Sequence, residues 1–211
     1  MTKKGILTVV SGFSGAGKGT IMKALMEQYQ ERYALSISAT TREPRAGEVD
    51  GREYFFCSKE SFEAMIEKDE LIEYANYVDH YYGTPKAYVE KMLEDGKDVI
   101  LEIEIQGALK VRKKFPDTLL LFVSPPCADT LKSRLVGRGT EDIKTIEKRL
   151  TRATEESLGI ENYDYFVIND DLKTCVEQVH SIIQNEKSRV SRNINLINQI
   201  REELKGFSEG E

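Results

Sequence analysis

One short segment near the amino terminus constrains the fold more than any other part of the chain. An apolar run, Ile6–Val10, leads into a glycine-rich loop, Gly12–Thr20, and then into apolar residues at helical spacing. Strand, glycine loop, lysine and helix is the order that wraps backbone N–H groups around phosphates. Glycines allow a left-handed backbone and close approach to an anion, and the helix adds free amides and the positive end of its dipole. The segment therefore predicts a phosphate loop in an α/β protein.

The lysine of this loop and the residues after it set expectations for the metal. Lys18 supplies a mobile positive charge that can reach the outer phosphates of a nucleotide. The usual motif continues with Ser or Thr, but here Gly19 follows, and Thr20 comes one residue later. We expect Mg²⁺ to be held by water and nucleotide oxygens, or by Thr20, because Mg²⁺ usually retains several waters. A glycine-rich turn that binds nothing is the alternative, and the agreement of loop, lysine and flanking elements argues against it.

Composition limits the class of protein. With 211 residues, of which 40% are hydrophobic, the chain can build one sizeable core with inserted subdomains. A formal net charge of −6 argues against a general nucleic-acid binder. No apolar run approaches the length needed to cross a bilayer, and the first residues do not resemble a signal peptide. Cys57, Cys127 and Cys175 lie far apart, so we expect free thiols in a cytoplasmic protein rather than disulfides or a zinc site.

Strand-like and helix-like segments alternate, which predicts a mostly parallel sheet flanked by helices. We expect further strands near residues 34–38, 53–56, 71–78, 99–105, 118–123 and 166–169. Helices are expected near 58–68, 86–95, 107–115, 128–136 and 141–158, with another from Leu172. Two excursions, 37–90 and 126–155, interrupt this core. After about Ser188 a polar tail carries apolar residues at helical spacing, which could extend the last helix, dock on the core or support a homodimer.

The first excursion contains groups suited to a phosphate. Arg42 and Arg45 flank a proline in a loop that begins near Ser38, and two guanidinium groups so placed can grip one phosphate from two sides. Tyr54 follows and could donate its hydroxyl to the same phosphate. Taken alone, the loop also fits a solvated surface, and Tyr54 also fits an ordinary aromatic of a sheet.

The same excursion contains groups suited to a purine base. Glu73 lies in an alternating strand, and a carboxylate can accept two adjacent hydrogen bonds from guanine N1–H and N2–H₂. Adenine lacks that donor pair, so the wrong base would leave the carboxylate unpaired. Tyr81–Pro85 reads as a glycine turn in which Tyr82 could touch a phosphate and Thr84 a base carbonyl. By itself, Glu73 also fits an ordinary surface glutamate.

Charged residues later in the chain complete the candidate set. Glu102 and Glu104 are two apart in an apolar strand, so we expect them on one face at its carboxyl end, where a metal or ligand carboxylate is typical. The second excursion is basic and contains Lys132, Arg134, Arg138, Lys144, Lys148, Arg149 and Arg152. A salt-bridged helical surface is one interpretation of these charges. The other is a lid whose arginines, above all Arg134, Arg138 and Arg149, close over phosphates.

Five motifs in the same order give the chain a resemblance to the guanylate kinase family. They are Ser-Gly-Ala-Gly-Lys, Thr-Thr-Arg-x-Pro-Arg-x-Gly-Glu, Tyr-Tyr-Gly-Thr, Glu-Ile-Glu-Ile-Gln-Gly and Gly-Arg-Gly-Thr-Glu, and the likeness spans roughly residues 5–188. The resemblance implies a P-loop NTPase-type parallel sheet flanked by helices, with an inserted GMP-binding region and a helical lid. It also implies phosphoryl transfer from ATP to GMP, and use of dGMP as well. The implied parts are a P-loop core at 1–36, 91–125 and 156–211, a GMP-binding region at 37–90 and a lid at 126–155.

The resemblance also implies roles for single residues. The implied ATP site comprises Ser14, Gly15, Ala16, Gly17, Lys18, Gly19, Thr20 and Asn169. The implied GMP site comprises Ser38, Arg42, Arg45, Tyr54, Glu73, Tyr82, Thr84, Glu102 and Glu104. Lys18, Arg42, Arg134, Arg138 and Arg149 are the implied catalytic residues. Two positions depart from the family pattern: Glu104 stands where Asp is common, and Phe13 replaces a frequent loop proline, a change from which we expect little consequence.

Two other functions stay open from the sequence. One is a non-catalytic guanylate-kinase-like domain that binds phosphorylated partner proteins, although such domains typically have a degraded phosphate loop and lid. The other is a phosphotransferase of the same fold that acts on another nucleotide or a phosphosugar. Glu73, Ser38 and Thr84 argue against this second alternative, because together they favour guanine as the base. The expected partners are therefore ATP and GMP, with no nucleic acid and no membrane.

Overall fold

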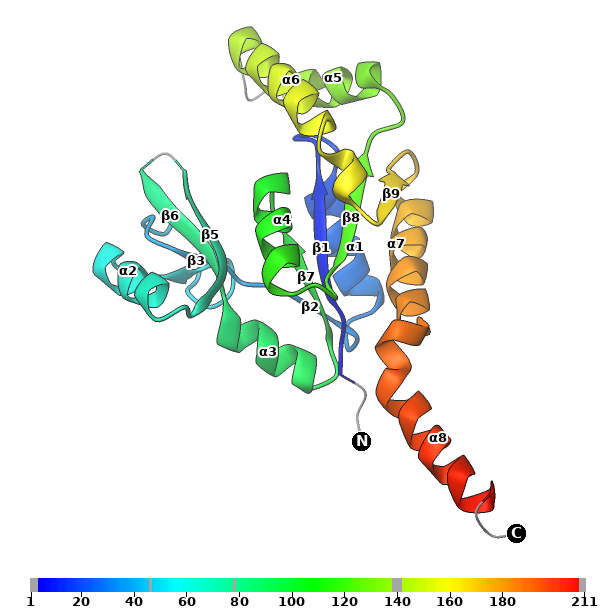
Figure 1. Ribbon diagram of the computed structural model, residues 1–211. Coiled ribbons are helices and arrows are strands. Elements are labelled where there is room, and N and C mark those ends of the chain that lie inside the picture. The colour runs from blue at the N-terminus through cyan, green and yellow to red at the C-terminus, as the bar shows by residue number, and fades with distance from the viewer. Residues whose placement is uncertain (1–3, 46, 78, 138–141, 209–211) are drawn as a thin grey trace.

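A five-stranded parallel sheet forms the centre of the computed structural model, which describes residues 4–45, 47–77, 79–137 and 142–208. Its strand order is β2-β7-β1-β8-β9 (Figure 1). The strands are β1 Leu7–Gly12, β2 Tyr33–Leu35, β7 Asp98–Glu102, β8 Leu119–Ser124 and β9 Tyr165–Ile168. β8 is buried at all six positions, because a parallel sheet covered on both faces needs continuous apolar strands.

Helices cover both faces of this sheet. One face packs on α1 Lys18–Gln28 and α7 Leu172–Glu186, and the other on α3 Lys86–Glu94 and α4 Ile105–Lys114. The two resulting apolar clusters share the sheet, with Ile21 and Val179 in one and Val89 and Val111 in the other. The chain is therefore an α/β protein with a parallel sheet flanked by helices, as the sequence predicts.

A second, four-stranded sheet lies beside the first, with the order β4-β3-β6-β5 (Figure 1). Its strands are β3 Ala39–Thr40, β4 Phe55–Phe56, β5 Leu71–Tyr77 and β6 His80–Pro85. Helix α2, Lys59–Glu67, begins after the predicted cap Ser58, whose Oγ accepts from the backbone N–H of Ser61 (3.1 Å). Phe62 of α2 is fully buried against this sheet and stacks on Tyr81. All of these strands fall within the first excursion.

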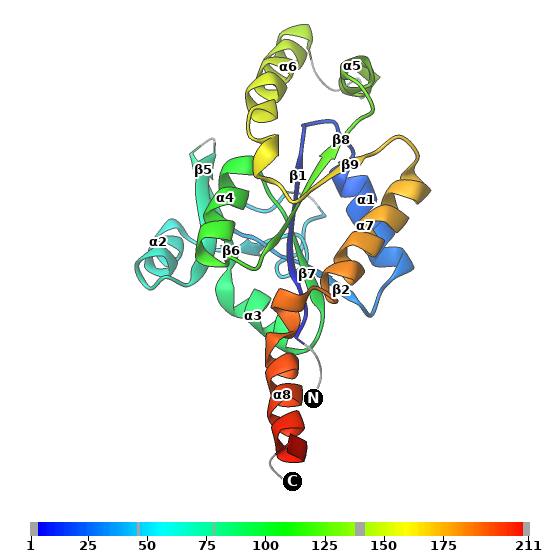
Figure 2. The same cartoon turned by 45° about the vertical axis from the view of Figure 1, so that its right-hand side comes forward.

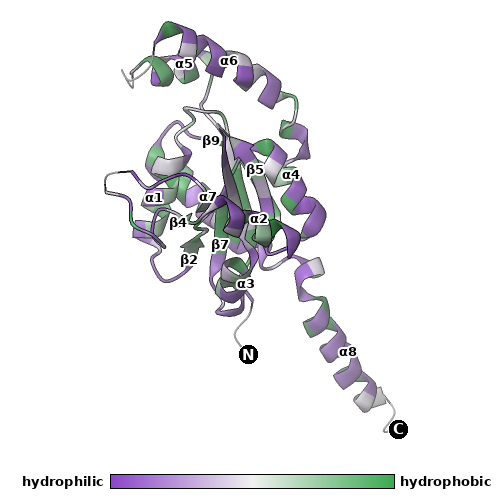
Figure 3. Ribbon diagram, turned by 90° about the vertical axis from the view of Figure 1, so that its left-hand side faces the viewer, coloured by the Kyte–Doolittle hydropathy of each residue, from purple (hydrophilic) through white to green (hydrophobic). Residues whose placement is uncertain are grey.

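Two helices stand beyond the carboxyl ends of the central strands (Figures 1 and 2). They are α5 Ala128–Gly137 and α6 Ile143–Ser157, and they bury a small apolar cluster that includes Leu131, Leu135 and Ile146. α6 is otherwise largely hydrophilic (Figure 3). A short 3₁₀ helix, Ile160–Asn162, returns the chain from α6 to β9.

The carboxyl-terminal tail forms a separate helix rather than an extension of α7. A 3₁₀ turn, Val190–Asn193, breaks the path, and α8 Ile194–Ser208 leads away from the core (Figures 1–3). Arg192 holds this turn against the core, because its guanidinium donates to the Glu186 carboxylate (3.3 Å) and to the Asp117 carbonyl (2.6 Å). Several apolar side chains of α8, including Leu204 and Phe207, remain exposed.

Some expected boundaries are wrong. The strand expected at 99–105 ends at Glu102, because the Glu104 carbonyl accepts from Ala108 N–H (2.9 Å) and so already begins α4. The strand expected at 34–38 ends at Leu35 of β2, and residues 36–38 connect it to β3 of the other sheet, which starts at Ala39. The strand expected at 53–56 is only β4, and Gly83 lies inside β6, paired with Ala39 and Tyr74, rather than in a turn.

Among the described residues, no helix combines the length and apolarity that a membrane crossing requires. All three cysteines are free thiols, with Cys175 buried and Cys127 exposed. Of the motif Gly-Arg-Gly-Thr-Glu, the first residue, Gly137, ends α5, and residues 138–141 lie outside the described residues.

Gly83 offers a test of the packing in the smaller sheet. A Cβ at this position would lie 2.9 Å from both the Glu73 carbonyl and Phe62 Cζ. We expect Gly83→Ala to lower the free energy of unfolding by about 1–3 kcal/mol, because overpacking forces neighbours apart. Urea unfolding measures this. The matched control is Gly206→Ala in α8, where nothing lies within 4 Å and helix propensity favours alanine; equal losses in both variants would contradict the packing described.

Candidate functional site

The glycine loop joins the carboxyl end of β1 to the start of α1. Gly15 and Gly17 adopt φ of 96° and 91°, a left-handed conformation that side chains disfavour. The Ala16 N–H donates to the Phe13 carbonyl (3.0 Å), which closes the turn. Because α1 begins at Lys18, the first N–H groups of the helix have no acceptor within it and are available to an anion. The local geometry is therefore that of an anion-binding loop.

Lys18 lies folded back over this loop. Its Nζ donates to the carbonyls of Gly12 (2.7 Å) and Phe13 (3.2 Å). Thr20 is exposed on the first turn of α1, and a Cβ at Gly19 would meet nothing within 4 Å. The replacement of the usual hydroxyl residue by Gly19 thus leaves open space beside the lysine.

Segments far apart in sequence meet this loop. Asn169, directly after β9, donates from Nδ2 to the Ala16 carbonyl (2.8 Å). Arg134 of α5 donates to the Asn169 carbonyl (2.8 Å) and approaches the Ala16 carbonyl (3.4 Å). Arg149 of α6 donates to Ser14 Oγ (2.8 Å). Three predicted residues of different segments, Asn169, Arg134 and Arg149, are therefore gathered at the loop.

Phe13 packs the glycine loop against the central sheet. Its ring packs edge-on against Phe122 of β8, with centroids 5.0 Å apart. Gly17 is constrained from the other side, because a Cβ there would lie 2.4 Å from Asn169 Nδ2. The loop is thus fitted closely between β8 and the residues after β9.

Glu73 is a buried carboxylate in the smaller sheet. Only 8% of the residue is exposed, and its Oε1 accepts from Thr84 Oγ1 (2.8 Å). Burial raises the pKa of Glu73, while the Thr84 hydrogen bond and the charge of Lys110 act in the opposite direction. A Cβ at Gly107, in the first turn of α4, would lie 3.4 Å from Glu73 Oε2. The predicted pair Glu73 and Thr84 is brought together, and a surface glutamate is excluded.

Arg42 lies in a cluster of aromatic and acidic groups. Its guanidinium makes a two-pronged ion pair with Glu48, each bond 2.9 Å, and lies 5.3 Å from the centre of the Tyr54 ring. The rings of Tyr54 and Tyr82 meet edge to face, with centroids 5.9 Å apart. The hydrogen bonds that Arg42 donates to Glu48 raise its pKa, burial opposes that rise, and the interaction with the Tyr82 hydroxyl adds to it. Arg42, Tyr54 and Tyr82 are thus one cluster.

Two other predicted residues border that cluster. The Arg45 backbone N–H donates to Glu48 Oε2 (2.7 Å), and its side chain is exposed. Ser38 is half-buried just before β3, and its carbonyl accepts from Phe55 N–H (2.9 Å).

The expectation that Glu102 and Glu104 share a strand face is wrong. Glu102 ends β7, whereas Glu104 caps α4 in an extended backbone conformation. Desolvation raises the pKa of Glu102, and the charge of Lys18 opposes that rise. Glu104 instead pairs with Arg152 of α6, with Oε2 and Nη2 2.5 Å apart. The two carboxylates therefore face different neighbours, because the chain changes from strand to helix between them. Arg138 lies outside the described residues.

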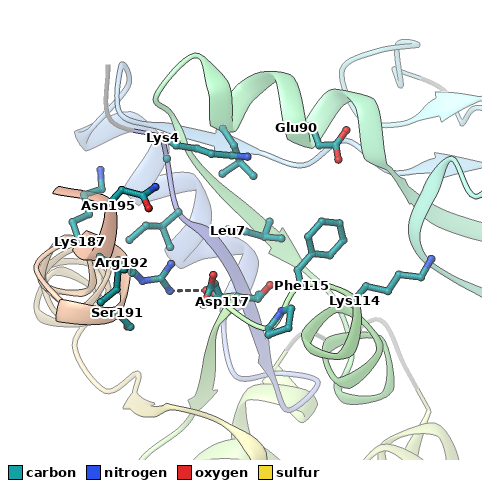
Figure 4. A pocket seen from close by; sticks show the side chains of 16 residues that line it. Lys4, Leu7, Glu90, Lys114, Phe115, Asp117, Lys187, Ser191, Arg192 and Asn195 are labelled. Carbon is teal, nitrogen blue, oxygen red and sulfur yellow. Dashed lines mark hydrogen bonds between the residues drawn. The ribbon is translucent and has the colours of Figure 1, made fainter. Parts of the chain in front are cut away.

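A cavity of about 620 Å³ lies at the other end of the central sheet (Figure 4). Its lining includes Lys4 and Leu7, at the amino end of β1, together with Phe115, Arg192 and Asn195. Figure 4 shows Arg192 hydrogen-bonded to Asp117 at its edge. Since the glycine loop lies at the carboxyl end of β1, this cavity is separate from the gathered residues.

Comparison with known proteins places the chain in a family. Residues 4–186 match the family described as Guanylate kinase. The chain belongs to the guanylate kinase family. A guanylate kinase from Caldanaerobacter subterraneus subsp. tengcongensis is 55% identical over 95% of this chain and 97% of its own length. One from Clostridioides difficile is 54% identical over 96% of this chain and 98% of its own length.

A solved structure agrees in fold. The crystal structure of guanylate kinase from Anaplasma phagocytophilum superposes with a TM-score of 0.70 at 28% identity, and the match covers 90% of each chain. The match to the guanylate kinase family ends at residue 186, so η2, Val190–Asn193, and α8 lie beyond it.

No specific role for Glu48 or Arg152 follows from the sequence patterns alone. Glu48 is the last residue of the Thr-Thr-Arg-x-Pro-Arg-x-Gly-Glu motif. Its position six residues after Arg42 is the one feature of the sequence that could have indicated an ion pair between them. Arg152 stood among the basic residues of the second excursion, with nothing local to separate it from Lys144 or Lys148. Its partner Glu104 is 48 residues away, a pairing that only the fold creates.

Proposed function

We propose that the chain transfers the γ-phosphoryl group of ATP to GMP, giving ADP and GDP. Family membership supports this activity. The structural observation that carries it is the junction of β7 and α4, which has the phosphate loop on one side and the buried Glu73 on the other. At this junction the charge of Lys18 lowers the pKa of Glu102, against the effect of burial, and Gly107 lies against Glu73. Two nucleotide sites so placed would face one another.

The base of GMP would be recognised at Glu73. An ionised carboxylate accepts both guanine N1–H and N2–H₂, while Thr84, which already donates to Glu73, is near enough to contact the same base. Because the carboxylate is buried, a base without these donors would leave it unpaired, which is costly. The site thus favours guanine over adenine.

The phosphate of GMP would lie at the Arg42 cluster. Tyr54 and Tyr82 flank Arg42, and Arg45 and Ser38 border them, so a phosphate would meet guanidinium and hydroxyl donors together. A GMP phosphate has a second pKa near 6 and is mostly dianionic at pH 7. It is already a nucleophile, so no general base is required. The obstacle is repulsion between two polyanions, which positioned cations reduce.

The phosphates of ATP would lie on the glycine loop, Ser14–Thr20. The loop amides and Lys18 would bind them, with Arg134 and Arg149 of the helices α5 and α6 at their outer side. Asn169 would border the adenine. In this proposal residues 37–90 bind GMP, residues 126–155 form the lid, and residues 1–36, 91–125 and 156–211 form the core.

We further infer a role for Mg²⁺. Among the described residues, no group of three or more His, Cys, Asp or Glu could hold a metal ion on its own. The exposed Thr20 hydroxyl and the Glu102 carboxylate beside Lys18 fit an ion held mainly by water and nucleotide oxygens. When bound with ATP, Mg²⁺ would neutralise charge on the β- and γ-phosphates.

A panel of acceptors tests the function directly. Purified protein with ATP and Mg²⁺ is offered GMP, dGMP, AMP or a phosphosugar, and ADP formation is followed by a coupled assay. We expect turnover with GMP and dGMP, and at least 10⁴-fold lower kcat/KM with AMP. No observation here favours the phosphopeptide-binding or phosphosugar alternatives; absence of ADP with every acceptor, or a preference for AMP or a phosphosugar, would contradict the proposal.

Lys18 is expected to act in transfer rather than in GMP binding. Lys18→Ala should lower kcat by about 10²–10³-fold with little change in GMP affinity, because the lysine charge serves the transferred phosphoryl group. The exposed Lys23→Ala on the same helix is the control. Steady-state kinetics and GMP titration measure both quantities, and unchanged turnover in Lys18→Ala would refute the assignment.

Glu73 should impose a pH dependence on GMP use. Its pKa is raised by burial, so protonation begins at a higher pH than for an ordinary glutamate, and only the ionised form accepts from guanine. As pH falls through this raised pKa, KM for GMP should increase. Glu73→Gln should raise KM for GMP about 10–100-fold at pH 7.5, through loss of charged hydrogen bonds.

In Glu73→Gln, the rise in KM for GMP at low pH should also become smaller. The part of the rise caused by protonation of Glu73 should be absent, and only the part caused by protonation of the GMP phosphate should remain. Glu67→Gln, an exposed position on α2, is the control. KM is measured from pH 5 to pH 8; a profile of Glu73→Gln parallel to the parent profile, with discrimination against AMP intact, would exclude Glu73 as the guanine carboxylate.

A further inference from the structure

Arg152 joins the end of α6 to the start of α4. Its Nη2 is 2.5 Å from Glu104 Oε2, and its Nε is 3.1 Å from Glu156 Oε1, one helical turn away. Glu104 is the capping residue of α4, since its carbonyl accepts the first helical hydrogen bond. One guanidinium therefore connects two carboxylates, one at the end of α6 and one at the start of α4.

The backbone brings the same two helices together. A Cβ at Gly159, just after α6, would lie 3.1 Å from Ile105 Cγ2, at the first residue of α4. Both views show the lower end of α6 beside the upper end of α4 (Figures 1 and 2). A displacement of α6 would consequently be felt at the amino end of α4.

The first turn of α4 in turn borders the proposed guanine site. Gly107, three residues after Glu104, leaves only 3.4 Å between the position of a Cβ and Glu73 Oε2. On the other side, the pKa of Glu156 is raised by burial and by Glu104, and lowered by Arg152 and Lys18. Contacts thus run from α6, through Arg152 and Glu104, to the turn that lies against Glu73, and the charge of Lys18 in the phosphate loop acts on Glu156 at the end of α6.

We propose that Arg152 is a positioning residue for GMP phosphorylation, which acts through Glu104. The inference rests on the proposed function. Arg152 neutralises a carboxylate at a junction that must receive two polyanions, and it fixes the turn of α4 that lies against Glu73. It also accounts for Glu104, because the shorter aspartate that the family resemblance leads one to expect would retract the carboxylate by one methylene from this partner.

The ion pair is suited to function more than to stability. Arg152 and Glu104 expose 46% and 64% of their side chains, and exposed pairs contribute little to folding. Loss of the pair should therefore leave the melting temperature within about 2–4 °C of the parent. The effect should fall on GMP use, which separates positioning from a general structural role.

A double-mutant cycle tests the proposal. Arg152→Met, Glu104→Gln and the double variant are compared with the full parent chain, with KM for GMP and kcat measured at saturating ATP. We expect Arg152→Met to raise KM for GMP about 5–30-fold, with a smaller change in kcat. In the Glu104→Gln background the same substitution should change KM less than 2-fold, because the partner is already lost.

Two further variants sharpen the outcome. Arg152→Lys keeps the charge and should recover part of the loss, and Glu104→Asp should resemble Arg152→Met in direction. Arg201→Met on the remote α8 is the control for loss of one arginine. Equal effects of Arg152→Met with and without Glu104, or behaviour like Arg201→Met, would overturn the positioning role. A parent protein that makes no ADP from ATP and GMP would instead overturn the proposed function.

Discussion

The position of β1 in the middle of a buried parallel sheet is the constraint on which the other features depend. β1 pairs with β7 on one side and β8 on the other, with Val10 opposite Glu102 and Gly12 opposite Val123. Because all five strands run the same way, the segments that follow them emerge at one edge. The glycine loop, Glu104 and Asn169 follow three different strands and lie at that edge for this reason.

Within the described residues, four cations of the site donate hydrogen bonds to protein acceptors. Lys18 donates to loop carbonyls, Arg42 to Glu48, Arg134 to the Asn169 carbonyl and Arg149 to Ser14. Such contacts fix the orientation of long side chains, so less conformational entropy remains to be lost when a phosphate replaces them. A bound phosphate would have to compete with Glu48 for Arg42, whereas the other three donors would exchange neutral acceptors for a charged one.

Local patterns in the sequence predicted the elements well where one residue type dictates the backbone. The apolar runs of β1 and β8 and the Ser58 cap of α2 are of this kind. Predictions were wrong where a tertiary contact decides. Glu102 and Glu104 looked like alternating strand residues, but β7 ends at Glu102 and Glu104 is the N-cap of α4. Gly83 looked like a turn residue, but its neighbours Phe62 and Glu73 require a glycine inside a strand.

By itself the sequence determined the phosphate loop, the α/β class and the family resemblance. Glycine positions, apolar periodicity and the order of motifs can all be read along the chain without knowing any tertiary contact. Only the tertiary structure decided that Glu73 is buried beside Thr84, that Arg42 pairs with Glu48, and that Arg152 reaches Glu104. These are pairings of charged or polar groups, and their energies depend on distance and burial, which no spacing along the chain specifies.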